Sequence, residues 1–128
     1  MQNINFPAGY LQLMPYLIIS NAAAFIQFTK NVFGANEKAR HMRDEKTIMH
    51  AEINIGECVI MIADSTEKYG VRRGGFFIYV ADADATCQLV LSHGATTITP
   101  VSDQPYGRSG GITDPFGNQW WVTAQNIA

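Results

Sequence analysis

The sequence has little charge, and its charges nearly balance. Only 16% of its 128 residues are charged, and nine basic against eleven acidic side chains leave a formal net charge of −2. Nucleic-acid backbones require a basic surface, so this balance excludes them as partners. No apolar run approaches the roughly 20 residues that cross a bilayer, and the segment from Met1 to Pro7 lacks the features of a signal peptide. We therefore expect a soluble, cytoplasmic protein that binds neither nucleic acid nor a membrane.

Cysteine is also scarce. Cys58 and Cys87 do not form a Cys-x-x-Cys pair, which would suggest a metal or redox site. A chain of this length that is 47% hydrophobic can build a core without disulfides. Cys58 lies in an apolar run and Cys87 in a helical pattern, so both are predicted to be small buried side chains.

Hydrophobic periodicity predicts the same order of elements twice: a strand, a helix and three strands. In the first half these elements are predicted at residues 11–19, 21–34, about 36–43, about 47–54 and 58–63. In the second half they are predicted at residues 76–80, 82–94, about 96–101, 109–113 and 119–123. Each helix is preceded by a residue that favours an N-cap and is followed by glycine.

Matching landmarks in the two halves lie about 60 residues apart, namely the helix caps Asn21 and Asp82 and the helix-ending glycines Gly34 and Gly94. We therefore predict an α+β fold of two βαβββ modules, about 11–66 and 75–125, in a single domain over 1–128. One such module leaves a face of its sheet uncovered. Two facing, curved mixed sheets would enclose a cleft, which is a natural site for a small molecule.

Seven segments carry a resemblance to a known family by their order and spacing, namely residues 16–25, 32–35, 49–56, 59–64, 101–104, 106–108 and 114–120. Together they resemble the vicinal oxygen chelate superfamily, which includes glyoxalase I, extradiol dioxygenases and the fosfomycin- and bleomycin-resistance proteins. The segments from residue 49 onward resemble its PhnB-like branch in particular. The resemblance implies the glyoxalase/bleomycin-resistance fold and a homodimer, so a second copy of the chain is an expected partner.

The resemblance also bears on metal binding. Metal-dependent members place His and Glu ligands on the first and last strands of each half, which correspond here to about Met14, Met61, Gly75 and Trp121. Thioether, glycine and indole are poor ligands for a hard divalent cation, so we expect no cofactor.

A divalent metal at a different place stays open. His50 and Glu52 are two residues apart on a predicted strand and therefore share a face, and His41 lies on the preceding strand. The alternative is that His50 and Glu52 pair with each other. If burial in an apolar cleft raised the pKa of Glu52, this residue could act as a catalytic base.

Strand alternation predicts an apolar, aromatic cleft face for a flat or amphipathic ligand. Its predicted residues are Tyr16, Val59, Met61, Phe77, Tyr79, Gln119 and Trp121. Trp120 should instead pack under a helix, because adjacent strand residues face opposite sides. The resemblance adds Tyr106 and Arg108, which match positions beside the family's pocket, and His50 and Glu52 complete the candidate ligand-binding set. The glycine-rich residues 107–111 are predicted to form a mobile loop next to the cleft.

Three functions remain open at this stage. The first is a metal-independent protein that binds an apolar or aromatic small molecule, as the resemblance to bleomycin-resistance proteins implies. The second is a metal-dependent lyase, isomerase or dioxygenase that uses His50 and Glu52. The third is a non-catalytic dimeric partner whose pocket is packed shut.

Overall fold

A computed structural model describes residues 3–125 of the chain, which form two helices and eight strands. The chain divides after Arg72 into two compact units. Each unit holds one helix and one four-stranded mixed sheet, so the predicted pair of βαβββ modules is confirmed. None of the helices in residues 3–125 is long and apolar enough to cross a membrane.

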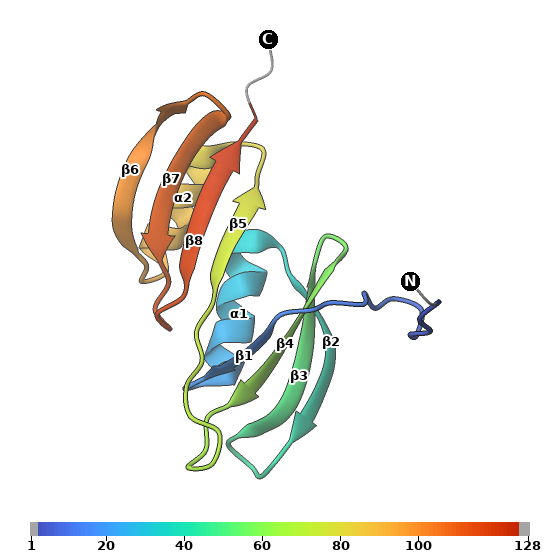
Figure 1. The fold of residues 1–128 in the computed structure, drawn as a ribbon. Coiled ribbons are helices and arrows are strands. Elements are labelled where there is room, and N and C mark those ends of the chain that lie inside the picture. Colours follow the sequence, from blue (N-terminus) through green and yellow to red (C-terminus); the bar gives the residue numbers. More distant parts are fainter. Residues whose placement is uncertain (1–2, 126–128) are drawn as a thin grey trace. The chain divides into compact units, whose positions relative to one another are not determined.

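In the first unit, one helix lies against one face of the sheet (Figure 1). The elements are β1 (Tyr16–Ile19), α1 (Ala22–Phe33), β2 (Asn36–Met42), β3 (Ile48–Ile55) and β4 (Cys58–Asp64). The strand order is β1-β4-β3-β2, with β1 parallel to β4 and the other pairs antiparallel. Because the unit has a single helix, the other face of this sheet is left open.

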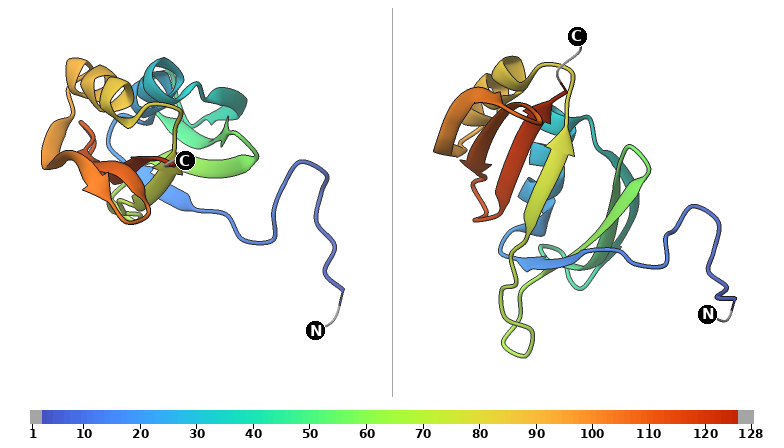
Figure 2. Two further views of the ribbon diagram at one scale, coloured as in Figure 1. Left: turned by 90° about the horizontal axis from the view of Figure 1, so that it is seen from above. Right: turned by 45° about the horizontal axis from the view of Figure 1, so that its top comes forward.

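The second unit repeats this topology. Its elements are β5 (Gly75–Tyr79), α2 (Ala83–Ser92), β6 (Thr96–Gln104), β7 (Gly107–Thr113) and β8 (Gln119–Ala124). The strand order is β5-β8-β7-β6, with β5 parallel to β8. Here too one helix covers one face of the sheet, as the two views of Figure 2 show for each unit.

The first strand is shorter than predicted. β1 begins at Tyr16, directly after Pro15, instead of at residue 11. Proline has no N–H for a strand ladder, and β1 is an edge strand of its sheet. Residues 3–13 form an arm without helix or strand that leads away from the first sheet (Figure 2).

The core of the first unit lies between α1 and the sheet. Phe25 and Ile26 of α1 are fully buried, as are Ile19, Ile53 and Ile62 of the strands. Helical spacing places the apolar residues of α1 on one side, and strand alternation places one apolar set on the inner face. The residues between them on each strand therefore point to the open face.

A buried carboxylate connects the helix to the strands in this unit. Asp64, at the end of β4, accepts hydrogen bonds from the backbone N–H groups of Ala22 (2.8 Å) and Ile48 (2.6 Å). The first N–H groups of a helix have no partner within the helix, and an anion near a helix N-terminus is favourable. Asp64 thereby joins the start of α1 to the start of β3.

A second buried carboxylate organises the turn before β8. Asp114 accepts the backbone N–H groups of Phe116 and Asn118, the Asn118 amide and, at 2.9 Å, the indole N–H of Trp120. The N–H of Gly117 bonds to the Asp114 carbonyl, which closes the turn. Trp120 is only 1% exposed, as predicted for the inward-facing tryptophan of the pair.

The prediction of a mobile glycine loop at 107–111 is wrong, because these residues belong to β7. Gly107 has φ of 144°, and an added Cβ would strike the Ala124 carbonyl. A Cβ at Gly111 would occupy the space of the Trp121 ring. These glycines therefore allow neighbouring groups to approach the backbone of β7 closely. The glycine content alone had suggested a flexible loop instead.

The two cysteines differ in burial. Cys87 on α2 is buried, as predicted, but Cys58 is exposed. Cys58 is the first residue of β4, next to the turn after β3. The prediction for Cys58 is therefore wrong, because strand ends adjoin solvent even where the following residues form the core.

Candidate functional site

The open face of the first sheet carries the candidate side chains from the sequence. In the β2–β3 register, His41 pairs with His50 and Met42 pairs with Ile48. One extra residue of β3, Met49, therefore lies opposite the β2 pair, which is a β-bulge. The bulge changes the alternation, so Ile48 is buried under α1 whereas Met49 is 54% exposed.

Three hydrogen bonds connect four side chains across this face. The Tyr16 hydroxyl lies 2.9 Å from His50 Nδ1, and His50 Nε2 lies 2.8 Å from Glu52 Oε2. The Tyr10 hydroxyl, from the N-terminal arm, donates to Glu52 Oε1 at 2.6 Å. An ionised carboxylate only accepts, so a neutral His50 carries its hydrogen on Nε2 and accepts the Tyr16 proton at Nδ1. We call this the Tyr16–His50–Glu52–Tyr10 chain.

Further groups from β2 surround the chain. The His41 ring stacks on that of His50, with centroids 6.3 Å apart. Lys38 lies over the Tyr10 ring, 4.5 Å from its centroid. The arm is therefore held to the sheet by two contacts of Tyr10, one with Glu52 and one with Lys38.

The pKa of Glu52 is shifted downward. Burial acts to raise the pKa of this carboxyl, but the hydrogen bonds from Tyr10 and His50 and the charge of Lys38 outweigh it and lower the pKa. The same contact raises the pKa of Tyr10, and burial raises the pKa of Tyr16. The pKa of Glu52 thus moves opposite to the direction that a buried catalytic base would need.

The donors on this face do not fit a metal ion well. Both ring nitrogens of His50 and both carboxylate oxygens of Glu52 already have partners. Residues 3–125 contain no group of three His, Cys, Asp or Glu side chains that could hold an ion. The direct contact of His50 with Glu52 agrees with the pairing alternative, and His41 is stacked on the ring.

The positions at which metal-dependent members of the resembled family hold their ligands also lack suitable donors in this chain. In the strand registers, Tyr16 pairs with Met61 and Phe77 pairs with Trp121. The residues of the first strands that lie beside Met61 and Trp121 are thus Tyr16 and Phe77. Each is two residues further along the chain than the predicted positions, Met14 and Gly75. None of them is a ligand that a hard divalent cation prefers.

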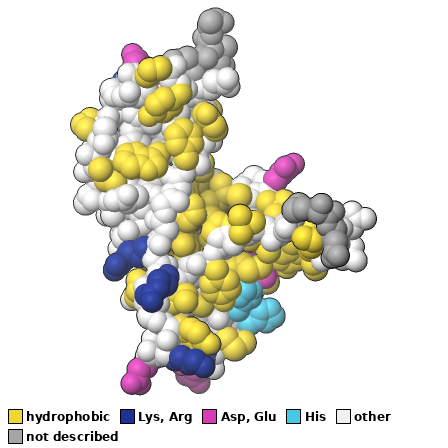
Figure 3. All heavy atoms as spheres, in the orientation of Figure 1, with side chains coloured by type: hydrophobic (Ala, Val, Ile, Leu, Met, Phe, Trp, Pro, Cys, Tyr) yellow, Lys and Arg dark blue, Asp and Glu magenta, His cyan; other side chains and the backbone are white. Residues whose placement is uncertain are grey.

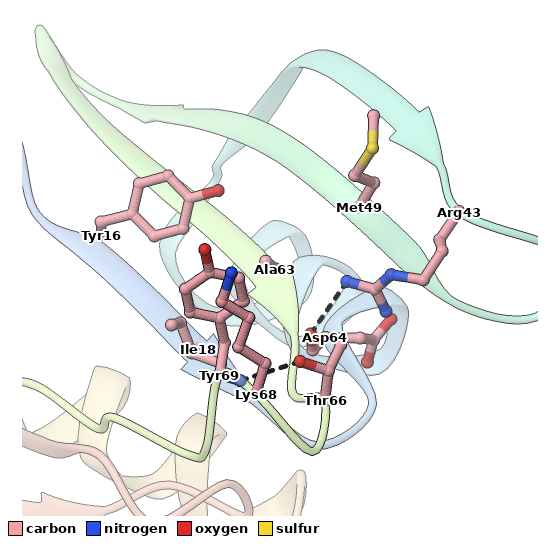
Figure 4. Close-up of a pocket in the computed structure, with 9 residues that line it drawn as sticks. All are labelled: Tyr16, Ile18, Arg43, Met49, Ala63, Asp64, Thr66, Lys68 and Tyr69. Atoms are coloured by element: carbon pink, nitrogen blue, oxygen red, sulfur yellow. Dashed lines mark hydrogen bonds between the residues drawn. The ribbon is translucent and has the colours of Figure 1, made fainter.

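A pocket of about 560 Å³ lies on the open face of the first unit. Its apolar wall consists of Tyr16, Ile18, Met49, Ala63 and Tyr69. The side chains of Tyr16, Met49 and Tyr69 surround the pocket in Figure 4, and each is about half exposed. An open pocket in this unit disfavours a protein whose site is packed shut.

The polar part of the pocket contains two cations and one carboxylate. Arg43, after β2, donates to the Asp64 backbone carbonyl at 3.4 Å, and Lys68 comes from the loop after β4 (Figure 4). Asp64 lines the pocket, but its oxygens accept the two backbone N–H groups described above. Thr66 accepts the Tyr69 N–H at 2.9 Å, which holds this loop at the pocket.

The open face of the second sheet carries an aromatic group. Phe77 lies 5.2 Å from Tyr79 and 6.2 Å from Tyr106 between ring centroids, and Trp121 covers Gly111. These side chains are between 37% and 65% exposed. Hydrophobic side chains gather on the visible surface of each unit in Figure 3, with histidines beside them in the first. The aromatic face predicted for this half is therefore present.

Arg108 has acidic partners of its own. Its guanidinium pairs with Asp84 of α2 and, at 3.1 Å, with Asp103 of β6. The hydrogen bonds that Arg108 donates to these carboxylates raise the pKa of Arg108. Its charge is thus compensated within the second unit, whereas the sequence placed it among the ligand-binding residues.

The sequence identified part of this site. Tyr16, His50, Glu52 and Met61 do lie on the open face of the first sheet, but Val59, predicted with them, is fully buried. Of the nine residues that line the pocket, only Tyr16 was predicted, and the sequence missed Ile18, Arg43, Met49, Ala63, Asp64, Thr66, Lys68 and Tyr69. Ile18 and Ala63 follow the same alternation as Tyr16 and Met61, so that signal could have found them. Met49 is exposed by the bulge, and Arg43, Thr66, Lys68 and Tyr69 lie in turns and loops, where strand alternation gives no signal.

Residues 9–122 match the model of the Glyoxalase/Bleomycin resistance protein/Dioxygenase superfamily. An uncharacterised protein of Mycobacterium bovis is 32% identical over 120 residues, which cover 84% of this chain and 79% of that protein.

Two solved structures show the same fold. The antibiotic-binding protein TnmS3 from Streptomyces sp. CB03234 has a TM-score of 0.69 at 15% identity, covering 91% of this chain and 98% of that one. A PhnB protein from Bacillus cereus has a TM-score of 0.70 at 16% identity, covering 89% of this chain and 99% of that one.

Proposed function

Because the chain belongs to the glyoxalase/bleomycin resistance protein/dioxygenase superfamily, we propose that it is a small-molecule-binding protein that holds an apolar or aromatic ligand without a metal ion. The observation that carries this proposal is the largely apolar pocket of about 560 Å³ on the first sheet. Pockets of some 300–1,000 Å³ with a few polar groups are typical of small-molecule sites.

The exposure of the pocket wall supports a flat ligand. Tyr16 is 46%, Met49 54% and Tyr69 57% exposed, so three large side chains keep apolar surface in water. Covering about 100 Å² of that surface would contribute about 2.5 kcal/mol to binding. Ring faces also favour planar ligands, which stack with an offset.

Independence from metal is part of the proposal. It is supported by the donor chemistry, because the Tyr16–His50–Glu52–Tyr10 chain uses both nitrogens of His50 and both oxygens of Glu52. An ion bound by both His50 and Glu52 would have to displace at least one of these hydrogen bonds. TnmS3 is named as an antibiotic-binding protein, so binding alone can be the function of a protein with this fold.

The test uses 7-methoxycoumarin, a neutral planar fluorescent probe, in equilibrium dialysis with and without a chelator. We expect saturable binding that the chelator does not change. In Met49→Ala the affinity should fall about three- to tenfold, because apolar contact area is lost. Leu89→Ala, which truncates an exposed side chain on α2, is the matched control and should leave the affinity unchanged.

Two results would overturn the proposal. One is the absence of saturable binding by this probe and by a panel of neutral bicyclic aromatics. The other is binding that is lost on chelation and restored by a divalent ion, with about one ion per chain by mass spectrometry. The second result would favour the metal-dependent alternative, and His50→Ala with Glu52→Ala would then be expected to release the ion.

We also propose a homodimer. The arm exposes Ile4, Phe6 and Leu13, the last at 88%, and contiguous exposed apolar side chains favour a protein interface. A second copy of the chain is the occupant we infer, since edge strands and apolar arms benefit from pairing. Sedimentation equilibrium should give a dimer for the native chain and a weaker one for Phe6→Ser with Leu13→Ser; a native monomer would contradict the idea.

A further inference from the structure

We propose that the pocket of the first unit selects planar ligands with an acidic oxygen, such as a phenol or enol, and holds that oxygen as its anion. This inference rests on the proposed function, because it concerns the ligand of the same pocket. It follows from two cations, Arg43 and Lys68, that line the pocket from different segments.

Six Lys and Arg residues in 3–125 have no carboxylate within ion-pair distance, namely Lys38, Arg43, Lys46, Lys68, Arg72 and Arg73, and of these only Arg43 and Lys68 line the pocket. Lys30 and Arg40 both pair with Glu37, and Arg108 pairs with two aspartates. Arg43 instead donates to a backbone carbonyl, and Lys68 lies over the Tyr69 ring at 5.3 Å from its centroid. Neither has a carboxylate within ion-pair distance among the described residues.

The acidic groups near the pocket are already occupied or lie outside its wall. Asp64, the one carboxylate in the wall, is 7% exposed and accepts the N–H groups of Ala22 and Ile48. Asp44, beside Arg43, accepts the backbone N–H groups of Lys46 and Thr47.

The remaining acidic side chains of the two loops, Glu45 and Glu67, do not line the pocket. Glu52 does not line the pocket either; it is connected to the wall residue Tyr16 only through His50 in the hydrogen-bond chain. A ligand oxygen in the pocket therefore faces two cations and a single carboxylate whose oxygens are engaged.

The arrangement of the pocket places charge beside an apolar surface. In Figure 4, Arg43 reaches toward Asp64 on the side of Met49, and Lys68 lies next to Tyr69. A planar ligand that covers the tyrosine rings would bring its polar edge near these cations. A guanidinium and an ammonium both donate and cannot accept hydrogen bonds, so they favour an ionised oxygen over a neutral hydroxyl.

The expected size of this preference follows from known effects of charges on acids. A neighbouring cation lowers the pKa of an acid by 1–3 units when it is close. Since this pocket is open to solvent, we expect a decrease of about one unit for a bound phenol, equivalent to about tenfold tighter binding of the anion than of the neutral form. The O–H bond of the ligand breaks, and its proton passes to the buffer.

The experiment compares two probes of nearly the same shape. In 7-hydroxycoumarin the hydroxyl titrates near neutral pH, and its anion has a distinct excitation band. In 7-methoxycoumarin a methyl ether prevents ionisation. The pKa of the hydroxyl is measured by fluorescence in free solution and in the presence of saturating protein. We expect binding of both probes and a decrease of about one unit in the pKa of the first.

Charge-removing variants locate the effect. Arg43→Met and Lys68→Met should each reduce the pKa decrease by about half, and the double variant should abolish it. Both substitutions keep an unbranched apolar stem, and the readout is the pKa of the bound hydroxyl at saturating protein, which does not depend on the affinity for the neutral probe. Lys46→Met is the matched control: it removes one charge from the β2–β3 turn outside the pocket wall and should leave the pKa decrease intact.

The possible failures are distinguishable. If both coumarins bind equally and the pKa of the hydroxyl is unchanged, the inference about ionised oxygens is wrong while the proposed function stands. If the decrease persists in the Arg43→Met, Lys68→Met double variant, the two cations are not its cause and the inference is again wrong. If neither probe binds, the inference is wrong, and the proposed function is wrong as well when the panel of neutral bicyclic aromatics also fails to bind.

Discussion

Replacing Glu52 by glutamine tests the Tyr16–His50–Glu52–Tyr10 chain with little change in side-chain size. The native carboxylate accepts from Tyr10 at 2.6 Å and from His50 at 2.8 Å. In Glu52→Gln one accepting oxygen becomes an NH₂ group, which faces a donor. The substitution therefore removes the charge and leaves one of the two hydrogen bonds without an acceptor.

The size of the loss follows from the burial of the chain. A hydrogen bond to a charged group contributes about 1.5–3 kcal/mol when buried. The Glu52 side chain is 9% exposed, but that of His50 is 26% exposed. Solvent therefore screens the interaction, and we reduce the expected contribution of the hydrogen bond accordingly. We expect Glu52→Gln to lower the free energy of unfolding by about 1–2 kcal/mol at pH 7, equivalent to roughly 3–10 °C in Tm for a chain of this size.

The dependence on pH has a definite sign. Because the pKa of Glu52 is lowered below its ordinary value of 4.5 in the folded protein, its contribution is fully present above that value. The contribution is lost as the pH falls through the folded-state pKa. The difference between native protein and Glu52→Gln should therefore be constant near neutral pH and shrink as the pH falls below the ordinary carboxyl pKa of 4.5.

Urea unfolding at a series of pH values measures this difference. Glu57→Gln, in the exposed turn after β3, removes the same charge from the same unit and is the matched control, with an expected change of less than about 0.5 kcal/mol. The reasoning would be refuted by a Glu52→Gln variant as stable as the control at pH 7. A difference that stayed undiminished at pH 3 would show that the charge is not its source.

Three further predictions concern the second unit and the cysteines. Gly111→Ala should displace the ring of Trp121 and cost about 1–3 kcal/mol, seen as increased acrylamide quenching; unchanged quenching would contradict the close approach. Asp114→Ala should cost about 3 kcal/mol or more in urea unfolding, because several buried donors lose their acceptor; a loss under 1 kcal/mol would contradict this role. Cys58, being exposed, should react with a thiol reagent in the native protein, whereas burial raises the pKa of Cys87 and should delay its reaction until unfolding; equal rates would be inconsistent with the fold.

Local physical rules predicted most of the fold. Asn21 and Asp82 cap the two helices, as predicted from their places before the helical patterns. Each depends on neighbours in the chain, so no tertiary information is needed. The repeated order of elements then limited the topology to one unit that occurs twice.

The candidate site was predictable only where strands alternate regularly. Phe77, Tyr79 and Trp121 follow the alternation and lie on the open face of the second sheet, with Trp120 buried behind them. Val59 was wrongly predicted to line an open cleft, because it is fully buried. Alternation predicts which side of the sheet a side chain points to, but not how completely its neighbours cover that side chain.

The sequence by itself determined the two βαβββ modules, their helix limits and the aromatic character of their open faces, because these depend on periodicity and on local hydrogen bonding. Only the tertiary structure decided that His50 bridges Tyr16 and Glu52 and that the arm is held through Tyr10. It also decided that Arg43 and Lys68 border one pocket. These contacts join residues far apart in the chain, and a one-residue bulge, invisible to periodicity, sets the direction of the β3 side chains between them.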